Sequence, residues 1–178
     1  MLHQTLTTNP RLRAWLRRQL PFLATIVLVL ALDQISKALV RFYLLPGESF
    51  PDTGWFRLTH VLNSGASFGL FQGKNVALAI TGLIGVLAII LYYRYMSVQS
   101  IWLRIALGLQ LGGAIGNLTD RARLGYVTDF FDVGAWPVFN VADSSLVTGI
   151  LLAIAFTFWG EWKRPNTGAS QPPDASSP

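Results

Sequence analysis

Apolar residues are gathered into four long runs, and most polar residues lie between them. The last three runs span approximately residues 75–96, 101–118 and 141–159. The first begins at Pro21, but its uninterrupted apolar part, residues 21–32, makes only about 18 Å of helix. A helix needs about 20 residues to cross a bilayer core, so the first span must continue through Asp33 and Lys37. The pattern predicts four membrane-spanning helices.

The two ends of the chain differ from the central segment. In residues 1–20, arginines alternate with apolar residues after Asn9 and Pro10, which predicts a short basic amphipathic helix along the inner leaflet. A disordered basic tail that only sets the topology fits this segment almost as well. Residues 163–178 are rich in Pro, Ser, Gly and Ala, which is typical of disorder. A four-helix membrane domain is expected over residues 21–162.

Residues 45–72 connect the first two spans and have a pattern of their own. Within residues 55–62, apolar side chains alternate with polar ones such as Arg57 and Thr59, which favours a strand. Small and amide residues follow at positions 63–69 and suit close approach of the backbone to a ligand. The expected fold is an all-α integral membrane protein, with four transmembrane helices, a small extracytoplasmic β-sheet and an outer loop between the third and fourth helices.

Composition supports a membrane protein and narrows the chemistry. Of the 178 residues, 52% are hydrophobic and 13% are charged, against about 25% charged in soluble domains. The chain has no cysteine, which excludes disulfides, thiolate nucleophiles and cysteine-ligated metals. His3 and His60 are the only histidines, which argues against a metal site and against Ser/His catalysis. No cofactor is expected.

The basic residues are distributed by membrane side. With both termini inside, the inner segments hold eight of the fourteen Lys and Arg residues and two acids, whereas the outer segments hold six basic and seven acidic residues. This asymmetry follows the positive-inside rule, and it explains the net charge of +5 without a nucleic-acid partner. Asp129 and Asp143 are therefore expected at the outer face.

Asp33 and Lys37 are spaced i,i+4, so on a helix they share one face and offset each other's charge. A structural pair that positions the first helix is favoured over direct contact with substrate. Further along the chain, three glycines in the third span suit close packing of another helix or of a lipid-bearing peptide; they are Gly112, Gly113 and Gly116.

Three polar residues end the third span: Asn117, Asp120 and Arg121. Glycine packing does not explain them, and they are placed to bind backbone or headgroup oxygens. Asp120 is expected to pair with an arginine or to cap the chain rather than to catalyse.

Asp129 and Asp143 flank the last outer segment. Each has a simpler explanation, since Asp143 precedes residues 144–146 and is suited to cap a helix, while Asp129 and Asp132 fit solvated loop charges. Two carboxylates held close together, however, cannot both ionise readily, so one keeps a proton while the other acts as a base. Such a pair can hydrolyse an amide through an activated water, without a covalent intermediate.

Four sequence blocks, taken in order, resemble the bacterial lipoprotein signal peptidase (signal peptidase II) family of membrane aspartyl proteases. The blocks are residues 33–37, 63–68, 112–121, and 127–130 with 139–143, and the resemblance covers about residues 21–162. It implies that Asp129 and Asp143 are the catalytic dyad. The residues that it implies support the dyad or contact substrate are Asp33, Lys37, Asn63, Gly65, Asn117, Arg121, Asn140 and Ala142. Asp120 falls in a motif outside the dyad, and Asp132 has no motif role.

The resemblance also implies a substrate. It would be a prolipoprotein whose lipobox cysteine carries diacylglycerol, cleaved just before that cysteine at the outer face of the bacterial cytoplasmic (inner) membrane. Membrane lipids and globomycin-type inhibitors are the other implied partners, and a monomer is expected. The stretch 129–143 looks shorter than in many members of the family, so an outer lid here is not expected to match theirs in size and reach. Gly125 and Gly134 are candidate hinges for such a lid.

Two other functions compete with proteolysis. A proton- or ion-coupled transporter would use Asp33, Lys37 and the two aspartates as a relay, but it predicts polar residues at several depths, and here they gather on the outer side. A non-catalytic membrane scaffold would leave the paired aspartates without a purpose.

Overall fold

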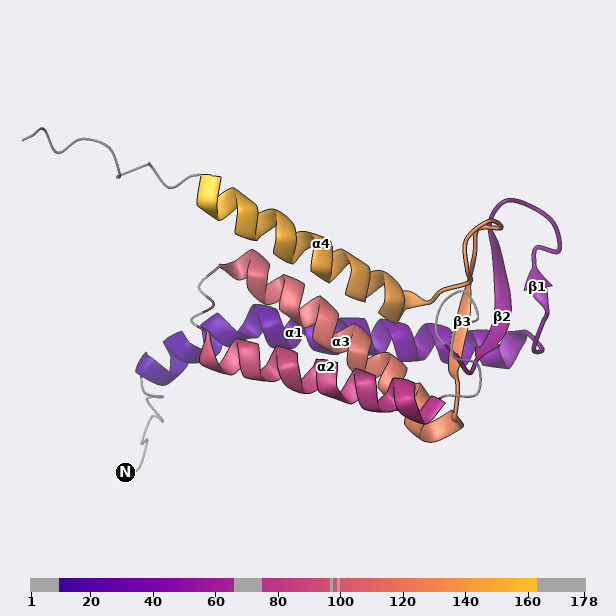
Figure 1. Ribbon diagram of the computed structural model, residues 1–178, viewed down its shortest axis with the longest axis horizontal. Helices are drawn as coiled ribbons and strands as arrows, with labels where there is room; N and C mark the ends of the chain where they lie inside the picture. The colour runs from indigo at the N-terminus through magenta and orange to yellow at the C-terminus, as the bar shows by residue number, and fades with distance from the viewer. Residues whose placement is uncertain (1–9, 66–74, 97, 99, 163–178) are drawn as a thin grey trace, which may run out of the picture.

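Four long helices form a bundle with a small sheet at one end (Figure 1). The computed structural model describes residues 10–65, 75–96, 98 and 100–162. The helices are α1 Pro10–Tyr43, α2 Asn75–Tyr95, α3 Ile101–Leu124 and α4 Val141–Trp162. Each contains a stretch that is long and apolar enough to cross a membrane. The prediction of four spanning helices is confirmed.

The first helix is longer than the predicted span. The basic segment and the apolar run form one helix of 34 residues that continues through Pro21, so residues 20 and 21 are not separated by a break. A proline removes a single backbone donor, whereas ending a helix in an apolar setting would leave several backbone groups unpaired. The proposed cap, Asn9, lies outside the described residues, as does the expected disordered tail.

The third helix also extends beyond its predicted end at residue 118, to Leu124. It stops at Gly125, whose φ of 80° is in the left-handed region and whose N–H donates to the Arg121 carbonyl at 3.2 Å. Glycine adopts this conformation without steric cost, so it suits the end of a helix. The extra turns keep Asn117, Asp120 and Arg121 on a rigid helix rather than in a loop.

α3 is the central helix of the bundle and packs against all three others, whereas α2 packs mainly against α3 and contacts α1 where Tyr93 stacks on Phe22. Glycines make the close contacts possible. A Cβ added at Gly112 would lie 2.9 Å from the Cβ of Val29 on α1, and one added at Gly113 would lie 2.5 Å from the Ala142 carbonyl oxygen on α4. The predicted packing role of these glycines is confirmed, and the partners are α1 and α4.

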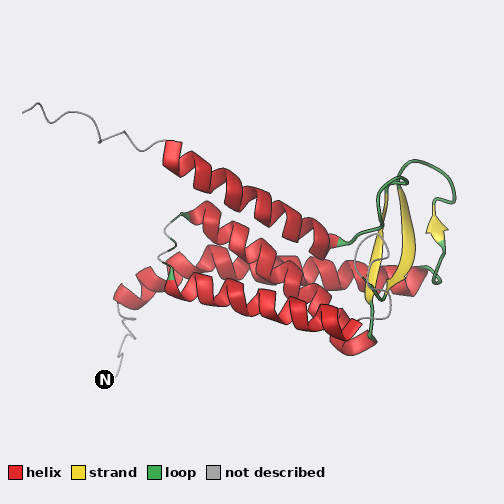
Figure 2. Cartoon of the chain, viewed as in Figure 1, coloured by secondary structure: helices red, strands yellow, loops and turns green. Residues whose placement is uncertain are grey.

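The predicted extramembrane sheet is present and has three antiparallel strands (Figure 2). They are β1 Ser49–Phe50, β2 Arg57–Asn63 and β3 Val127–Asp132, with β2 in the middle. The segment that holds β3 was expected to be loop. All of its residues except Phe131 are buried, so it lacks the alternation that identifies a half-exposed strand. Pairing of Val61 with Asp129 fixes the position of that carboxylate.

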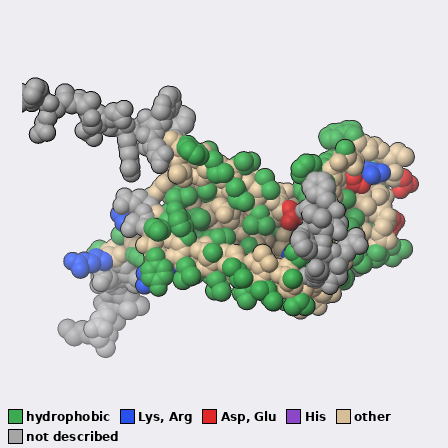
Figure 3. All heavy atoms as spheres, in the orientation of Figure 1, with side chains coloured by type: hydrophobic (Ala, Val, Ile, Leu, Met, Phe, Trp, Pro, Cys, Tyr) green, Lys and Arg blue, Asp and Glu red, His purple; other side chains and the backbone are tan. Residues whose placement is uncertain are grey.

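Polar and apolar side chains are segregated along the molecule (Figure 3). Apolar side chains cover the helices, Lys and Arg gather at the end where α1 begins, and the visible Asp and Glu lie toward the sheet. The exposed apolar residues of the helices, such as Val27, Ile84 and Leu151, are those that a bilayer would cover.

Candidate active site

The fold brings Asp129 of β3 and Asp143 of α4 to the wall of one cavity of about 340 Å³. The cavity lies between α2, α3, α4 and the sheet, and most of its other lining is apolar. Its remaining lining residues are Asn63, Gly65, Leu78, Gly82, Gly85, Ile89, Ala114, Asn117, Leu118, Arg121, Val127 and Leu146. Asp129 is only 1% exposed.

Three asparagine side chains hold the two carboxylates. Asp129 accepts hydrogen bonds from Asn63 Nδ2 at 2.7 Å and from Asn140 Nδ2 at 2.6 Å. Asp143 accepts from Asn117 Nδ2 at 2.8 Å and from the backbone N–H of Asn140 at 3.2 Å. Asn140 therefore binds both carboxylates and fixes one relative to the other. The amides are neutral donors, so they position the pair without neutralising its charge.

The surroundings of Asp129 favour its protonated form. Burial, and after it the nearby carboxylate of Asp143, raise the pKa of Asp129 from 3.8 to about 7, against the hydrogen bonds from Asn63 and Asn140 and the charge of Lys37. A carboxyl group with this pKa can both give and take a proton near neutral pH. The pair is thus suited to general acid and general base chemistry.

The first turn of α4 is a reciprocal cap. Asn140 precedes the helix, and its Oδ1 accepts from the Asp143 N–H at 2.9 Å, while Asp143 Oδ2 accepts from the Asn140 N–H. Asp143 does bind a backbone N–H, as the capping alternative expected, but the residue in the capping position just before the helix is Asn140. The cap fixes the Asp143 carboxylate by local backbone geometry.

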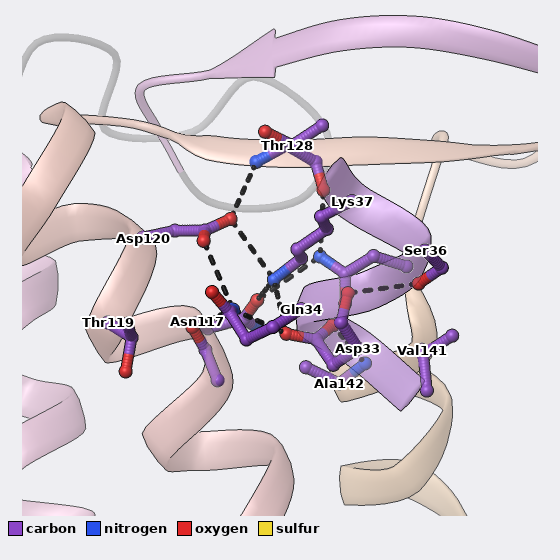
Figure 4. Close-up of polar contacts among 12 residues, drawn as sticks. Asp33, Gln34, Ser36, Lys37, Asn117, Thr119, Asp120, Thr128, Val141 and Ala142 are labelled. Carbon is purple, nitrogen blue, oxygen red and sulfur yellow. Dashed lines mark hydrogen bonds and ion pairs between the residues drawn. The ribbon is translucent and has the colours of Figure 1, made fainter. Parts of the chain in front are cut away.

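A buried ion cluster lies behind the pair (Figure 4). Lys37 and Asp33 are both fully buried, with Nζ and Oδ2 2.9 Å apart, so the predicted i,i+4 pair is confirmed. Lys37 Nζ also donates to Asn117 Oδ1 at 2.9 Å, and Asp33 Oδ1 accepts the Ala142 N–H at 3.0 Å. The cluster therefore positions α3 and α4, which carry the residues around Asp143.

Asp120 belongs to the same cluster, and its main partner differs from the predicted one. Its Oδ2 lies 3.2 Å from Lys37 Nζ, whereas the nearest Arg41 nitrogen is 4.0 Å away. The same oxygen accepts the Thr128 N–H at 3.2 Å, next to Asp129 on β3. Gln34, which the sequence reasoning overlooked, donates to both Asp33 and Asp120 at 3.0 and 3.2 Å. Its position beside Asp33 within the first block was the available signal.

The other predicted residues divide between the cavity and its support. Gly65 lines the cavity and donates its N–H to Asn63 Oδ1 at 2.9 Å, which orients that amide toward Asp129. Arg121 also lines the cavity, and its Nε is buried with no hydrogen-bond partner among the described residues. Asp33, Lys37 and Ala142 do not line it. Residues 66–68 of the second block lie outside the described residues.

Asp132 has a structural role at the far end of β3. It is 5% exposed and accepts from Arg57 Nη2 at 2.6 Å and Thr59 Oγ1 at 2.8 Å, so it is not a solvated loop charge. The hydrogen bond from the Gly134 N–H lowers the pKa of Asp132 most, and the interactions with Thr59 and Arg57 lower it further. Burial acts in the opposite direction. Two aspartates three positions apart on one strand thus have opposite pKa shifts.

The site contains carboxylates and amides rather than a metal-binding set. Within residues 10–65 and the described parts of 75–162, no three His, Asp or Glu side chains are grouped so as to hold a metal ion. His60 is buried elsewhere in the sheet region, with Nδ1 2.8 Å from the Leu44 carbonyl oxygen. His3 lies outside the described residues.

The chain is similar to known proteins both in sequence and in fold. Residues 25–159 match the family model described as Signal peptidase (SPase) II. The lipoprotein signal peptidase of Moorella thermoacetica is 47% identical over 135 residues, which are 75% of this chain and 89% of that protein. The lipoprotein signal peptidase of Syntrophomonas wolfei is 44% identical, covering 82% and 98%.

Solved structures extend the likeness to three dimensions. One bacterial membrane enzyme superposes with a TM-score of 0.75 at 27% identity, over 84% of this chain and 94% of that chain. A second bacterial membrane enzyme gives a TM-score of 0.69 at 30% identity, over 76% and 91%.

Proposed function

The chain belongs to the signal peptidase II family, and from this premise we infer that it is a lipoprotein signal peptidase that hydrolyses the bond joining a signal peptide to a prolipoprotein. We propose that Asp129 and Asp143 perform the hydrolysis. The observation that carries this proposal is that Asn140 binds both carboxylates at the wall of one cavity. Neither the family nor the relatives favour a transporter.

The chemistry requires the pair to hold one proton between its two carboxyl groups. The ionised member takes a proton from a water molecule, whose oxygen attacks the scissile carbonyl carbon, while the protonated member gives its proton to the carbonyl oxygen. The resulting tetrahedral diol collapses as the amide nitrogen takes a proton from one carboxyl group of the pair, the C–N bond breaks, and a diol hydroxyl returns a proton to the other carboxylate. The products are a carboxylic acid and an amine, and the pair again holds one proton.

Arg121 supplies a cation beside the reacting groups. Its buried Nε has no hydrogen-bond partner in the part of the chain that the structure describes, and the side chain lines the same cavity as Asp129 and Asp143. We propose that Nε donates to a backbone carbonyl of the substrate. This interaction would orient the peptide, so that its scissile carbonyl faces the pair.

The cavity continues along one face of α2, where a helical signal peptide would lie. Four of its lining residues, Leu78, Gly82, Gly85 and Ile89, recur at helical spacing and cover about 16 Å of helix. Gly82 and Gly85 have no atom within 4 Å of an added Cβ, so an incoming helix can approach closely. This face of α2 is therefore free to receive the peptide, while Tyr93, near the end of α2, stacks on Phe22 of α1.

We also propose an orientation of the protein in the membrane and a specificity for lipid-modified substrates. Positive charge at the end where α1 begins supports both termini in the cytoplasm and the pair at the outer face of the bacterial cytoplasmic membrane. There the scissile bond precedes a diacylglyceryl-modified cysteine. We further propose that the protein works as a monomer among membrane lipids and that globomycin-type inhibitors occupy the cavity.

The test is cleavage of a diacylglyceryl-modified lipobox peptide by purified protein. We expect Asp129→Asn and Asp143→Asn each to reduce kcat by at least about 10³-fold, because removing either group leaves no proton relay. Asp52→Asn, in the exposed β1–β2 connection, is the matched control and should retain full activity. Appreciable cleavage by either dyad variant would contradict the assignment, and an inactive wild type would contradict the function.

A further inference from the structure

A second cavity, of about 320 Å³, shares Asp143 with the first. It lies between the segment that follows β3 and the first two turns of α4. Apart from Asp143 and Ser144 its lining is apolar and partly aromatic: Trp136, Pro137, Val138, Phe139, Leu146 and Val147. The reaction as described above has no use for this space.

The mouth of the second cavity opens at the surface that the bilayer would cover. Val147 is 58% exposed on α4, a spanning helix, and Trp136 is 60% exposed in the outer segment. Tryptophan is common where a membrane protein meets the headgroup region. An apolar molecule can therefore enter this cavity sideways from the outer leaflet, at the depth of Asp143.

The two cavities have different shapes. The first follows three turns of α2 past small residues, so it suits a helix. The second touches only Asp143 to Val147 of α4 and a short non-helical segment, and it offers no glycine path along a helix. It suits a flexible hydrocarbon chain, which needs apolar walls and no hydrogen-bond partners.

Asp143 and Leu146 line both cavities, so a bond held at Asp143 would lie where they meet, with its two sides leading into different spaces. We propose that the first cavity takes the signal peptide, and that the second takes an acyl chain of the diacylglyceryl group on the cysteine that follows the bond. This inference rests on the proposed function and adds the residues that select for the lipid.

The experiment compares two substrates that share one lipobox peptide and differ in acyl length, dipalmitoyl and dihexanoyl. Val147→Trp and the smaller Val147→Phe narrow the second cavity, and each should raise KM for the dipalmitoyl peptide by about tenfold, with little change for the dihexanoyl peptide. Val27→Trp, at a 67% exposed valine on α1 that lines neither cavity, is the matched control. It should leave both KM values unchanged.

Gly82→Leu narrows the first cavity at a position where nothing lies within 4 Å of an added Cβ. It should raise KM for both peptides equally, because both carry the same signal peptide. Equal effects of the Val147 variants on the two peptides, or an effect of Gly82→Leu that depends on acyl length, would overturn the assignment. Thermal unfolding of each variant checks that it is folded. A wild type that cleaves neither peptide would overturn the proposed function instead.

Discussion

At the scale of single residues, Asp129 links stability to pH. Its native pKa of about 7 lies above the ordinary 3.8, so the folded protein holds this proton between pH 4 and 7 while the unfolded chain releases it. The free energy of unfolding therefore falls as pH rises through this window, by about 4 kcal/mol if the whole shift applies. Below pH 4 the group contributes no dependence.

Asp129→Asn should remove that dependence, since asparagine does not titrate. The stability of the variant relative to wild type should therefore be higher at pH 8 than at pH 5. Thermal unfolding in detergent at both pH values measures this difference. Asp132→Asn is the comparison on the same strand, because the lowered pKa of Asp132 gives the opposite sign. Parallel curves for wild type and Asp129→Asn would contradict the raised pKa.

Lys37 is the only cation in contact with both Asp33 and Asp120 among the described residues. Lys37→Met would leave two buried carboxylates without their cation, and breaking a buried ion pair in this way costs about 3–5 kcal/mol. Chemical unfolding should show this loss. Arg41→Met removes a cation that is 4.0 Å from Asp120 and partly exposed, and it should cost about 1 kcal/mol or less. Equal losses would mean that the cluster does not hold the bundle.

At the scale of elements, the contact between α3 and α4 sets the position of Asp143. An added Cβ at Gly113 would lie 2.5 Å from the backbone oxygen of Ala142, next to Asp143 in the chain, so a substitution there must move α4. The chain cannot relieve this clash by rotating a side chain, because the atom it meets is backbone. Helix packing and catalysis are thus joined at one glycine.

Gly113→Ala should therefore lower both the midpoint of thermal unfolding and kcat, the latter by about 10²-fold for a displacement near 1 Å. Gly85→Ala on α2 is the matched control, since nothing lies within 4 Å of its added Cβ, and alanine favours a helix by about 0.5–1 kcal/mol. Its midpoint should stay the same or rise. A Gly113→Ala protein with wild-type turnover would show that α4 has more freedom than this packing allows.

At the scale of the whole molecule, the orientation in the membrane decides whether the pair can meet its substrate. The absence of cysteine makes this testable by single-cysteine labelling. Thr53→Cys lies in the exposed connection between β1 and β2, and Met96→Cys lies at the end of α2, 56% exposed. An impermeant maleimide should label the first in intact cells and the second only after permeabilisation. The reverse pattern would place the active site in the cytoplasm and contradict the proposed orientation.

The amino-acid sequence by itself determined the spans, the outer sheet and the family. Each of these depends on local information: apolar runs of membrane length, alternation over residues 55–62, and short blocks in a fixed order. The Asp33 and Lys37 pair was also predictable, because i,i+4 spacing on one helix decides it. Gly112 and Gly113 indicated close packing, because small residues in a spanning helix let another helix approach.

Only the tertiary structure decided which distant residues meet. Asp33 binds the Ala142 N–H across 109 positions of sequence, and Lys37 lies nearer to Asp120 than Arg41 does. β3 is a strand because it pairs with β2. The residues of β3 are nearly all buried, so their pattern alone does not indicate this pairing. The raised pKa of Asp129 likewise arises from burial and from a carboxylate on another element. Such properties depend on the packing of several segments at once, so no local pattern could supply them.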